Sequence, residues 1–166
     1  MRILIVDDEA DIVDMLAGVC RQDGHEVTAC TRSLDALNHV DREPVDLLIT
    51  DISMPAPDGL ELVRLARAKY PDLMAIVITG YAARYPLDEV LGAGASDLLL
   101  KPFRMEELRL RVGLAASRLQ TIASLRAQQR GLQEISTEMI RGLQNELELA
   151  RRLAPHPGDA ASTAGR

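Results

Sequence analysis

Five short runs of aliphatic residues recur up to about residue 102, and the early runs are each followed by a stretch with helical spacing of apolar residues. Most of the runs are continuous, without the alternation of a strand that has one face in water. Such strands are buried on both faces, so we expect a parallel sheet with helices on each side. Because strand–helix–strand connections are almost always right-handed, the pattern predicts a doubly wound α/β sheet. The predicted strands are Arg2–Val6, His25–Cys30, Asp46–Thr50, Met74–Thr79 and Asp97–Leu100.

Apolar residues at helical spacing predict helices after the first three strands. Ser33 can cap the second of these helices, and Asp58 can cap the third, because each side chain offers an oxygen to the free amides of a first turn. The apolar faces are defined by Ile12, Leu16 and Val19, by Leu34, Leu37 and Val40, and by Leu60, Val63 and Ala66.

Composition limits the classes of function that fit the chain. Its 166 residues suffice for one ordinary domain and an appendage. The formal charge of -6 disfavours general nucleic-acid binding, which depends on neutralising phosphates. Cys20 and Cys30 lie in apolar surroundings without metal-type spacing and are expected to pack in the core. No apolar run approaches the 18–20 residues that cross a bilayer, so we expect a soluble cytoplasmic protein without membrane contact.

Polar residues follow the apolar runs at the ends where parallel sheets bind ligands. Asp7 and Asp8 follow the first strand, Asp51 the third, Thr79 ends the fourth, and Lys101 follows the fifth. Taken singly, each could be a helix cap, a turn residue or a solvated surface residue. Taken together, three neighbouring carboxylates repel one another, and such an arrangement usually holds a cation or protonates one carboxyl group.

Magnesium suits this predicted cluster, because Mg²⁺ takes one or two carboxylates directly and keeps several waters or phosphate oxygens. Calcium would require more oxygen ligands than the sequence offers at these strand ends. A carboxylate beside Mg²⁺, a lysine and a hydroxyl can attack a phosphoryl group and become an acyl phosphate. An ionised carboxylate is already a nucleophile, so this chemistry needs no general base.

The segments that carry these residues resemble the receiver domain of two-component response regulators over Arg2 to about Val112. The resemblance implies a five-stranded flavodoxin-like sheet of order 2-1-3-4-5 and phosphoryl transfer from a histidine kinase or a histidine phosphotransfer protein. It therefore implies a phosphoacceptor regulatory protein rather than an enzyme with its own substrate. The motifs are "ILIVDDE", "LLITDISMPAPDGL", "IVITGYA" and "LLLKPF", in this order and spacing.

The resemblance also implies roles for individual residues. Asp51 would be the phosphoacceptor, Thr79 would move to meet the phosphoryl group, and Lys101 would hold one of its oxygens. The implied magnesium site consists of the phosphoacceptor, a direct ligand, a ligand acting mainly through water and one backbone carbonyl. These ligands are Asp51, Asp8, Asp7 and Ser53, respectively. The Lys101-Pro102 bond would be cis, a geometry that only X-Pro bonds make cheap.

Three positions depart from the pattern common in these domains. Leu98 stands where many receivers carry an aromatic ring that swings inward on activation, so signalling would pass through backbone shifts or packing on the face formed by the fourth helix, fifth strand and fifth helix. Ser53 and Tyr81 occupy the two positions that tune hydrolysis, and neither is charged. We predict that Tyr81 shields the phosphoryl group from water and slows its loss.

The chain changes character after the receiver. Residues 104–153 contain no proline and are rich in good helix formers, which predicts a helix of about 50 residues. We expect a receiver domain at 1–112, a helical extension at 113–153 and a disordered tail at 154–166. The last receiver helix is expected to begin near residue 104. A heptad-like seam runs from Leu108 to Ile122, where two consecutive three-residue steps shift its register. It resumes from Leu125 to Leu143, and Gln129 and Ser136 weaken it.

Several functions fit this extension. We favour a phosphorylation-controlled protein in which residues 104–153 form a parallel homodimer or dock a partner helix. The alternatives are a solvated helix without a partner, a phosphate shuttle or sink without its own output, and the N-terminal part of a longer effector such as a phosphatase. The stretch "LQNELELARRLAPHP" loosely resembles the helical lead into phosphatase domains that follow some receivers.

Overall fold

The computed structural model describes residues 1–80 and 84–153, which divide into two compact units, Met1–Thr121 and Ile122–Arg166. A five-stranded sheet forms the centre of the first unit, in the order β2-β1-β3-β4-β5, and every paired strand is parallel. This confirms the predicted strand order. The strands are β1 (Arg2–Val6), β2 (Glu26–Cys30), β3 (Leu47–Asp51), β4 (Met74–Thr79) and β5 (Asp97–Leu100).

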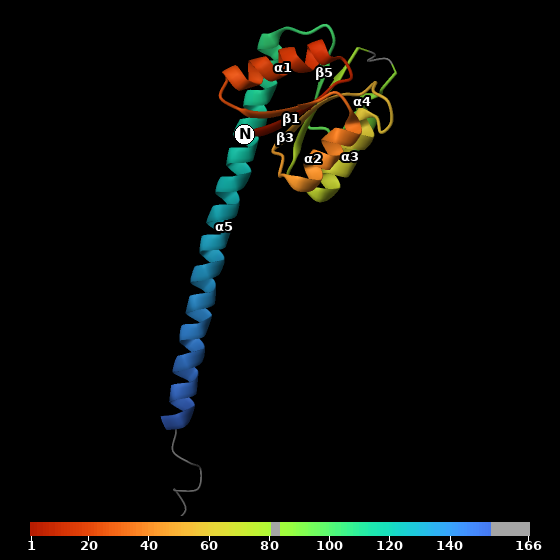
Figure 1. Cartoon of the computed structure of the whole chain (residues 1–166). Helices are drawn as coiled ribbons and strands as arrows, with labels where there is room; N and C mark the ends of the chain where they lie inside the picture. Colours follow the sequence, from red (N-terminus) through yellow and green to blue (C-terminus); the bar gives the residue numbers. More distant parts are fainter. Residues whose placement is uncertain (81–83, 154–166) are drawn as a thin grey trace, which may run out of the picture. The chain divides into compact units, whose positions relative to one another are not determined.

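Helices follow the strands in alternation and cover both faces of the sheet (Figure 1). One buried cluster joins the sheet to α2, α3 and α4, and a second joins it to α1 and the first turns of α5. The long helix contributes Leu108, Val112 and Ala115 to the second cluster, so its beginning is part of the domain core. The helices are α1 (Ala10–Gln22), α2 (Ser33–Arg42), α3 (Gly59–Lys69), α4 (Leu87–Gly92) and α5 (Met105–Leu153).

The two predicted helix caps have different outcomes. Asp58 caps α3 as predicted, because its carboxylate accepts a 2.8 Å hydrogen bond from the Glu61 amide. The cap predicted at Ser33 is wrong: the residue before α2 is Arg32, and no side chain caps the helix. Ser33 is already in the first turn and is buried, and its hydroxyl has no hydrogen-bond partner. Because α2 begins one residue earlier than predicted, Ser33 packs inside the first turn instead of capping the helix.

The core of the first unit is largely aliphatic, as the sequence predicted. All residues of β3 and β4 are buried, as the continuous apolar runs predicted. Cys20 is buried, Cys30 is half-buried, and both are free thiols. Leu34 is an exception to the predicted face of α2, because it is 51% exposed while Ala36 and Val40 face the core.

The second unit, in its described residues, consists of the remainder of α5. Every described residue from 123 to 153 is exposed apart from Gly131. Among the helices of residues 1–80 and 84–153, none combines the length and apolarity needed to span a membrane.

Candidate functional site

The strand ends bring four of the predicted polar residues to one edge of the sheet. Asp51 is the last residue of β3, and Thr79 is the last residue of β4. The amide of Lys101 donates a 2.8 Å hydrogen bond to the Thr79 carbonyl, which ties the loop after β5 to the end of β4. Asp7, Asp51 and Thr79 are at most 5% exposed, and polar side chains this buried require partners.

Lys101 provides the partner for both buried carboxylates. Its Nζ lies 2.9 Å from Asp7 Oδ2 and 2.9 Å from Asp51 Oδ1. Glu9 Oε1 lies 3.8 Å from the same nitrogen, at the exposed side of the site. The lysine therefore links the ends of β1 and β3, and the sequence indicated its proximity but not this double contact.

The local electrostatics follow from the double contact. Burial alone would lower the pKa of Lys101, but the hydrogen bonds and charges of Asp7 and Asp51 outweigh it, so the pKa of the lysine is raised. The ammonium group therefore stays protonated across the physiological range. It balances part of the negative charge that two buried carboxylates would otherwise place in a low-dielectric environment.

Backbone amides fix the other oxygen of each carboxylate. The amide of Ser53 donates to Asp51 Oδ2, and the amide of Glu9 donates to Asp7 Oδ1 at 3.0 Å. Each donor lies two residues after the aspartate that it binds, in the loop that follows the strand. Asp7 and Asp51 are therefore held between an amide and the lysine, which gives each carboxylate a defined orientation.

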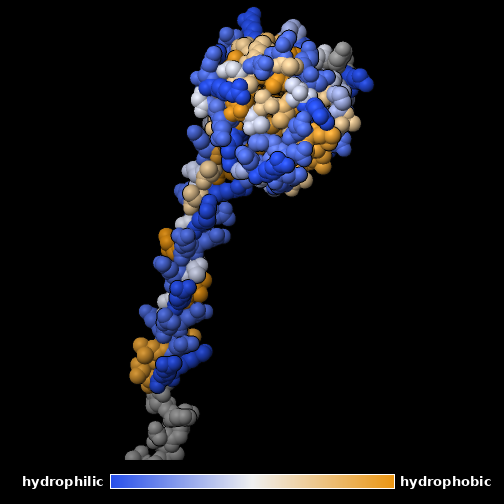
Figure 2. All heavy atoms as spheres, viewed as in Figure 1, coloured by the Kyte–Doolittle hydropathy of each residue, from blue (hydrophilic) through white to orange (hydrophobic). Residues whose placement is uncertain are grey.

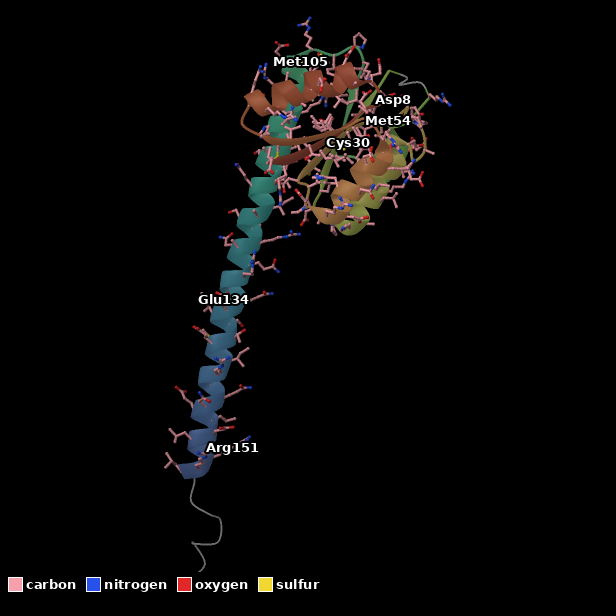
Figure 3. All side chains as sticks on the ribbon, in the orientation of Figure 1. Asp8, Cys30, Met54, Met105, Glu134 and Arg151 are labelled. Atoms are coloured by element: carbon pink, nitrogen blue, oxygen red, sulfur yellow. The ribbon has the colours of Figure 1, made fainter. Side chains whose placement is uncertain are left out.

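The two remaining predicted metal ligands lie on the exposed side. Asp8 follows Asp7 directly and is exposed (Figure 3), and Ser53 is exposed while its amide is engaged with Asp51. No cluster of three or more histidine, cysteine, aspartate or glutamate side chains arranged to hold a metal is found among residues 1–80 and 84–153. Lys101 instead contacts two of the three proposed carboxylate ligands.

The donor set still fits magnesium. It consists only of hard oxygen donors, and Mg²⁺ binds one or two carboxylates and completes its octahedron with water. Asp8 is open to solvent, so a hydrated ion can reach it without displacing Lys101 from Asp7. The predicted ligand roles of Asp7, Asp8, Asp51 and Ser53 remain predictions.

Gly59 is a site residue that the sequence reasoning missed. It is the first residue of α3, and its amide donates a 3.1 Å hydrogen bond to the Ile52 carbonyl. A Cβ at this position would lie 1.9 Å from the carbonyl oxygen of Asp51, so only glycine allows α3 to begin this close to the end of β3. The motif "LLITDISMPAPDGL" contains this glycine, but local sequence does not show which backbone atoms lie against it.

The loops around the site contain two cis peptide bonds. The Lys101-Pro102 bond is cis, which confirms the prediction, and the Ala56-Pro57 bond in the loop after β3 is also cis and was not predicted. Leu98 is half-buried and packs against the cluster formed by α2, α3 and α4. Tyr81, predicted to shield the phosphoryl group, lies outside the described residues.

A family comparison agrees with this geometry. The model for the response regulator receiver domain matches residues 3–113. The chain belongs to the response regulator receiver family. Among solved receivers, the domain from Methanospirillum hungatei aligns with a TM-score of 0.67 and 29% identity, covering 72% of this chain and 96% of that one. TrrA from Thermotoga maritima, solved in complex with Mg(2+)-BeF, aligns with a TM-score of 0.63 and 33% identity, covering 69% of this chain and 97% of that one.

Two curated relatives are much longer than the region that matches this chain. MprA of Mycobacterium leprae is 38% identical over 112 residues, which make up 68% of this chain and 49% of MprA. FleR of Pseudomonas aeruginosa is 35% identical over 107 residues, covering 64% of this chain and 23% of FleR. The chain thus spans half or less of these two response regulators, and the similarity concerns the receiver.

Proposed function

We propose that this receiver accepts a phosphoryl group on Asp51 from a histidine kinase or a histidine phosphotransfer protein. The observation that carries the proposal is the placement of Asp51, which ends β3 with its side chain held between the Ser53 amide and the Lys101 ammonium. In the transfer, an oxygen of the Asp51 carboxylate forms the new bond to phosphorus. The bond from phosphorus to the donor breaks, and its electron pair leaves with the donor nitrogen.

Lys101 and Thr79 would stabilise the transferred group. The Lys101 Nζ already lies 2.9 Å from Asp51 Oδ1, so a small movement brings it to an oxygen of the attached phosphoryl group. Thr79 is fixed at the end of the neighbouring strand, where its hydroxyl can donate to another oxygen. Magnesium, held by Asp7, Asp8, Asp51 and the Ser53 carbonyl, would neutralise charge on the phosphoryl oxygens.

The output is proposed to pass through α5, by dimerisation or by binding a partner helix at 104–153. Support comes from the exposed apolar side chains along the later part of this helix. A cytoplasmic location would give Asp51 access to the kinase. No aromatic ring occupies position 98 to act as a switch. The phosphorylation signal would therefore pass through backbone shifts or through changed packing near Leu98.

Phosphorylation is tested with a small phosphodonor such as acetyl phosphate, followed by intact-mass spectrometry with and without Mg²⁺. Wild type is expected to gain one acid-stable, base-labile phosphate that depends on the metal. Asp51→Asn should gain none, whereas the matched control Asp88→Asn, which changes an exposed residue in the first turn of α4, should behave as wild type. Equal phosphate on Asp51→Asn and wild type would refute the proposal.

A further inference from the structure

Large apolar side chains form a long exposed face on α5 after Ile122. Figure 2 shows orange groups along this part of the helix, interrupted by polar side chains. All described residues of the second unit belong to one helix, so within residues 122–153 no other element covers this face. The large apolar side chains on this face are 54% to 75% exposed. The side chains are Leu125, Leu132, Ile135, Met139, Ile140, Leu143, Leu147, Leu149 and Leu153.

The apolar face follows a heptad over 122–153, and its seam contains both apolar and polar residues. Most charged residues lie on the opposite side of the helix, which leaves the seam as the face available for pairing. The first seam position (a) is occupied by Ile122, Gln129, Ser136, Leu143 and Ala150. The second seam position (d) is occupied by Leu125, Leu132, Met139, Glu146 and Leu153.

A parallel pair in register would bring each seam residue against itself. Two copies of Glu146 would then meet in the interface as like charges, which costs stability. Two copies of Gln129 and two of Ser136 would form further polar layers, and two copies of Ala150 would leave a small-on-small layer. The parallel arrangement expected from the heptad spacing alone therefore uses this particular set of residues poorly.

An antiparallel pair with full overlap of 122–153 arranges the same residues differently. Position a of one helix then faces position d of the other, so Glu146 lies opposite Gln129 of the second copy and no like charges meet in the seam. Of the four remaining layers, two place a large residue opposite a small one, and two place large apolar residues opposite each other. The layers are Ile122 with Leu153, Leu125 with Ala150, Gln129 with Glu146, Leu132 with Leu143, and Ser136 with Met139.

The positions that flank the seam are also compatible with this pairing. In an antiparallel pair each flanking position faces the same type of position on the second helix, and none of these pairs joins like charges. Two apolar residues, Leu147 and Leu149, lie opposite Arg126 and Gln128, whose aliphatic stems can cover them. The flanking pairs are Arg126 with Leu147, Gln128 with Leu149, Gln133 with Ile140, and Ile135 with Gly142.

We propose that residues 122–153 pair with the same segment of a second copy of this chain, antiparallel and in full overlap. The proposal rests on the proposed function only for its role in output, because the pairing needs no phosphoryl group. The overlap joins 32 residues of each chain, which corresponds to an interface about 48 Å long. The two Ile122 residues lie at opposite ends of this interface, so each helix enters the pair from a different end.

The orientation can be tested by disulfide cross-linking of the full chain in a Cys30→Ser background. Cys20 can stay, because it is buried and burial raises the pKa of its thiol to about 11. Chains carrying Leu125→Cys or Ala150→Cys are produced separately and also together with different tags, and they are then oxidised with and without a phosphodonor. We expect covalent dimers that contain one chain of each type, and little cross-linking of either variant with itself.

A matched control uses Glu134→Cys and Arg141→Cys. These residues lie at the same level of the antiparallel pair but on the outer side of each helix, so the mixture should remain at background. Self-cross-linking of Leu125→Cys would show a parallel pair and overturn the proposal. Background cross-linking in every mixture, with a monomeric mass by light scattering in both conditions, would also overturn it. Phosphorylation of Asp51 is measured separately, so the antiparallel pairing and the phosphorylation can each be refuted without the other.

Discussion

The backbone of Gly59 lies so close to the carbonyl of Asp51 that a Cβ on the glycine would stand 1.9 Å from the carbonyl oxygen. The neighbouring atoms are backbone, which cannot move away as a flexible side chain could. The glycine therefore allows the start of α3 to lie directly against the end of β3 at Asp51.

Gly59→Ala is expected to lower the free energy of unfolding by about 3 kcal/mol, because α3 or β3 must shift to accept the methyl group. The matched control is Gly18→Ala in α1, where nothing lies within 4 Å of the added Cβ. That change should stabilise the protein by about 1 kcal/mol through helix propensity. Urea unfolding followed by circular dichroism measures both, and equal effects of the two substitutions would contradict the packing argument.

Lys101→Met should destabilise the domain by about 3 kcal/mol at neutral pH, because it leaves the buried carboxylates of Asp7 and Asp51 without their shared cation. Adding Asp51→Asn should recover part of this loss, since only one buried charge then remains unpaired. A double-mutant cycle from denaturant unfolding provides the measurement. Strictly additive losses would show that the lysine and Asp51 do not interact.

The raised pKa of Lys101 predicts a pH dependence at the alkaline end. The folded state holds the lysine proton more tightly than the unfolded state, so the stabilisation is complete below the unfolded pKa of about 10.4. It is lost as the pH rises through the higher folded pKa. The difference in unfolding free energy between wild type and Lys101→Met should therefore be constant from about pH 7 to pH 9 and shrink above about pH 10.5.

Arg67 connects α3 to two turns of the first unit. Its guanidinium donates hydrogen bonds to the carbonyls of Leu73 at 3.0 Å, Gly94 at 3.1 Å and Pro71 at 3.1 Å. Arg67→Met should lower the unfolding free energy by about 2 kcal/mol because it removes these charge-assisted bonds. Arg64→Met, at an exposed position of the same helix, should change it by less than about 0.5 kcal/mol. Thermal unfolding of both variants tests this, and similar midpoints would refute the role of Arg67.

The two thiols should react at different rates. Burial raises the pKa of both cysteines, and Cys20 is the more deeply buried, with a pKa of about 11. At pH 8 we expect iodoacetamide to modify Cys30 slowly and Cys20 only after unfolding. Peptide mapping after timed alkylation measures the order. Modification of Cys20 in the folded protein at a rate equal to that of Cys30 would contradict its placement in the core.

Much of the fold could be predicted because the continuous aliphatic runs of β1, β3 and β4 fit buried strands. The order of the strands came from the resemblance to receiver domains. The start of α2 was missed because Arg32 and Ser33 are adjacent, and local sequence does not show which one begins the helix. Lys101 was placed correctly at the site. Its simultaneous contact with Asp7 and Asp51 depends on distances between three strands, which no local pattern contains.

The first turns of α5 carry Leu108, Val112 and Ala115 into the core of the receiver, although the same helix continues beyond Thr121. A fusion joint at residue 112 would therefore cut through the domain rather than beside it. Exchange of output segments between receivers, in evolution or in the construction of chimeras, is expected to succeed when the junction follows Thr121 in the same helical phase. A helix that closes the core thus also sets where new modules can be attached.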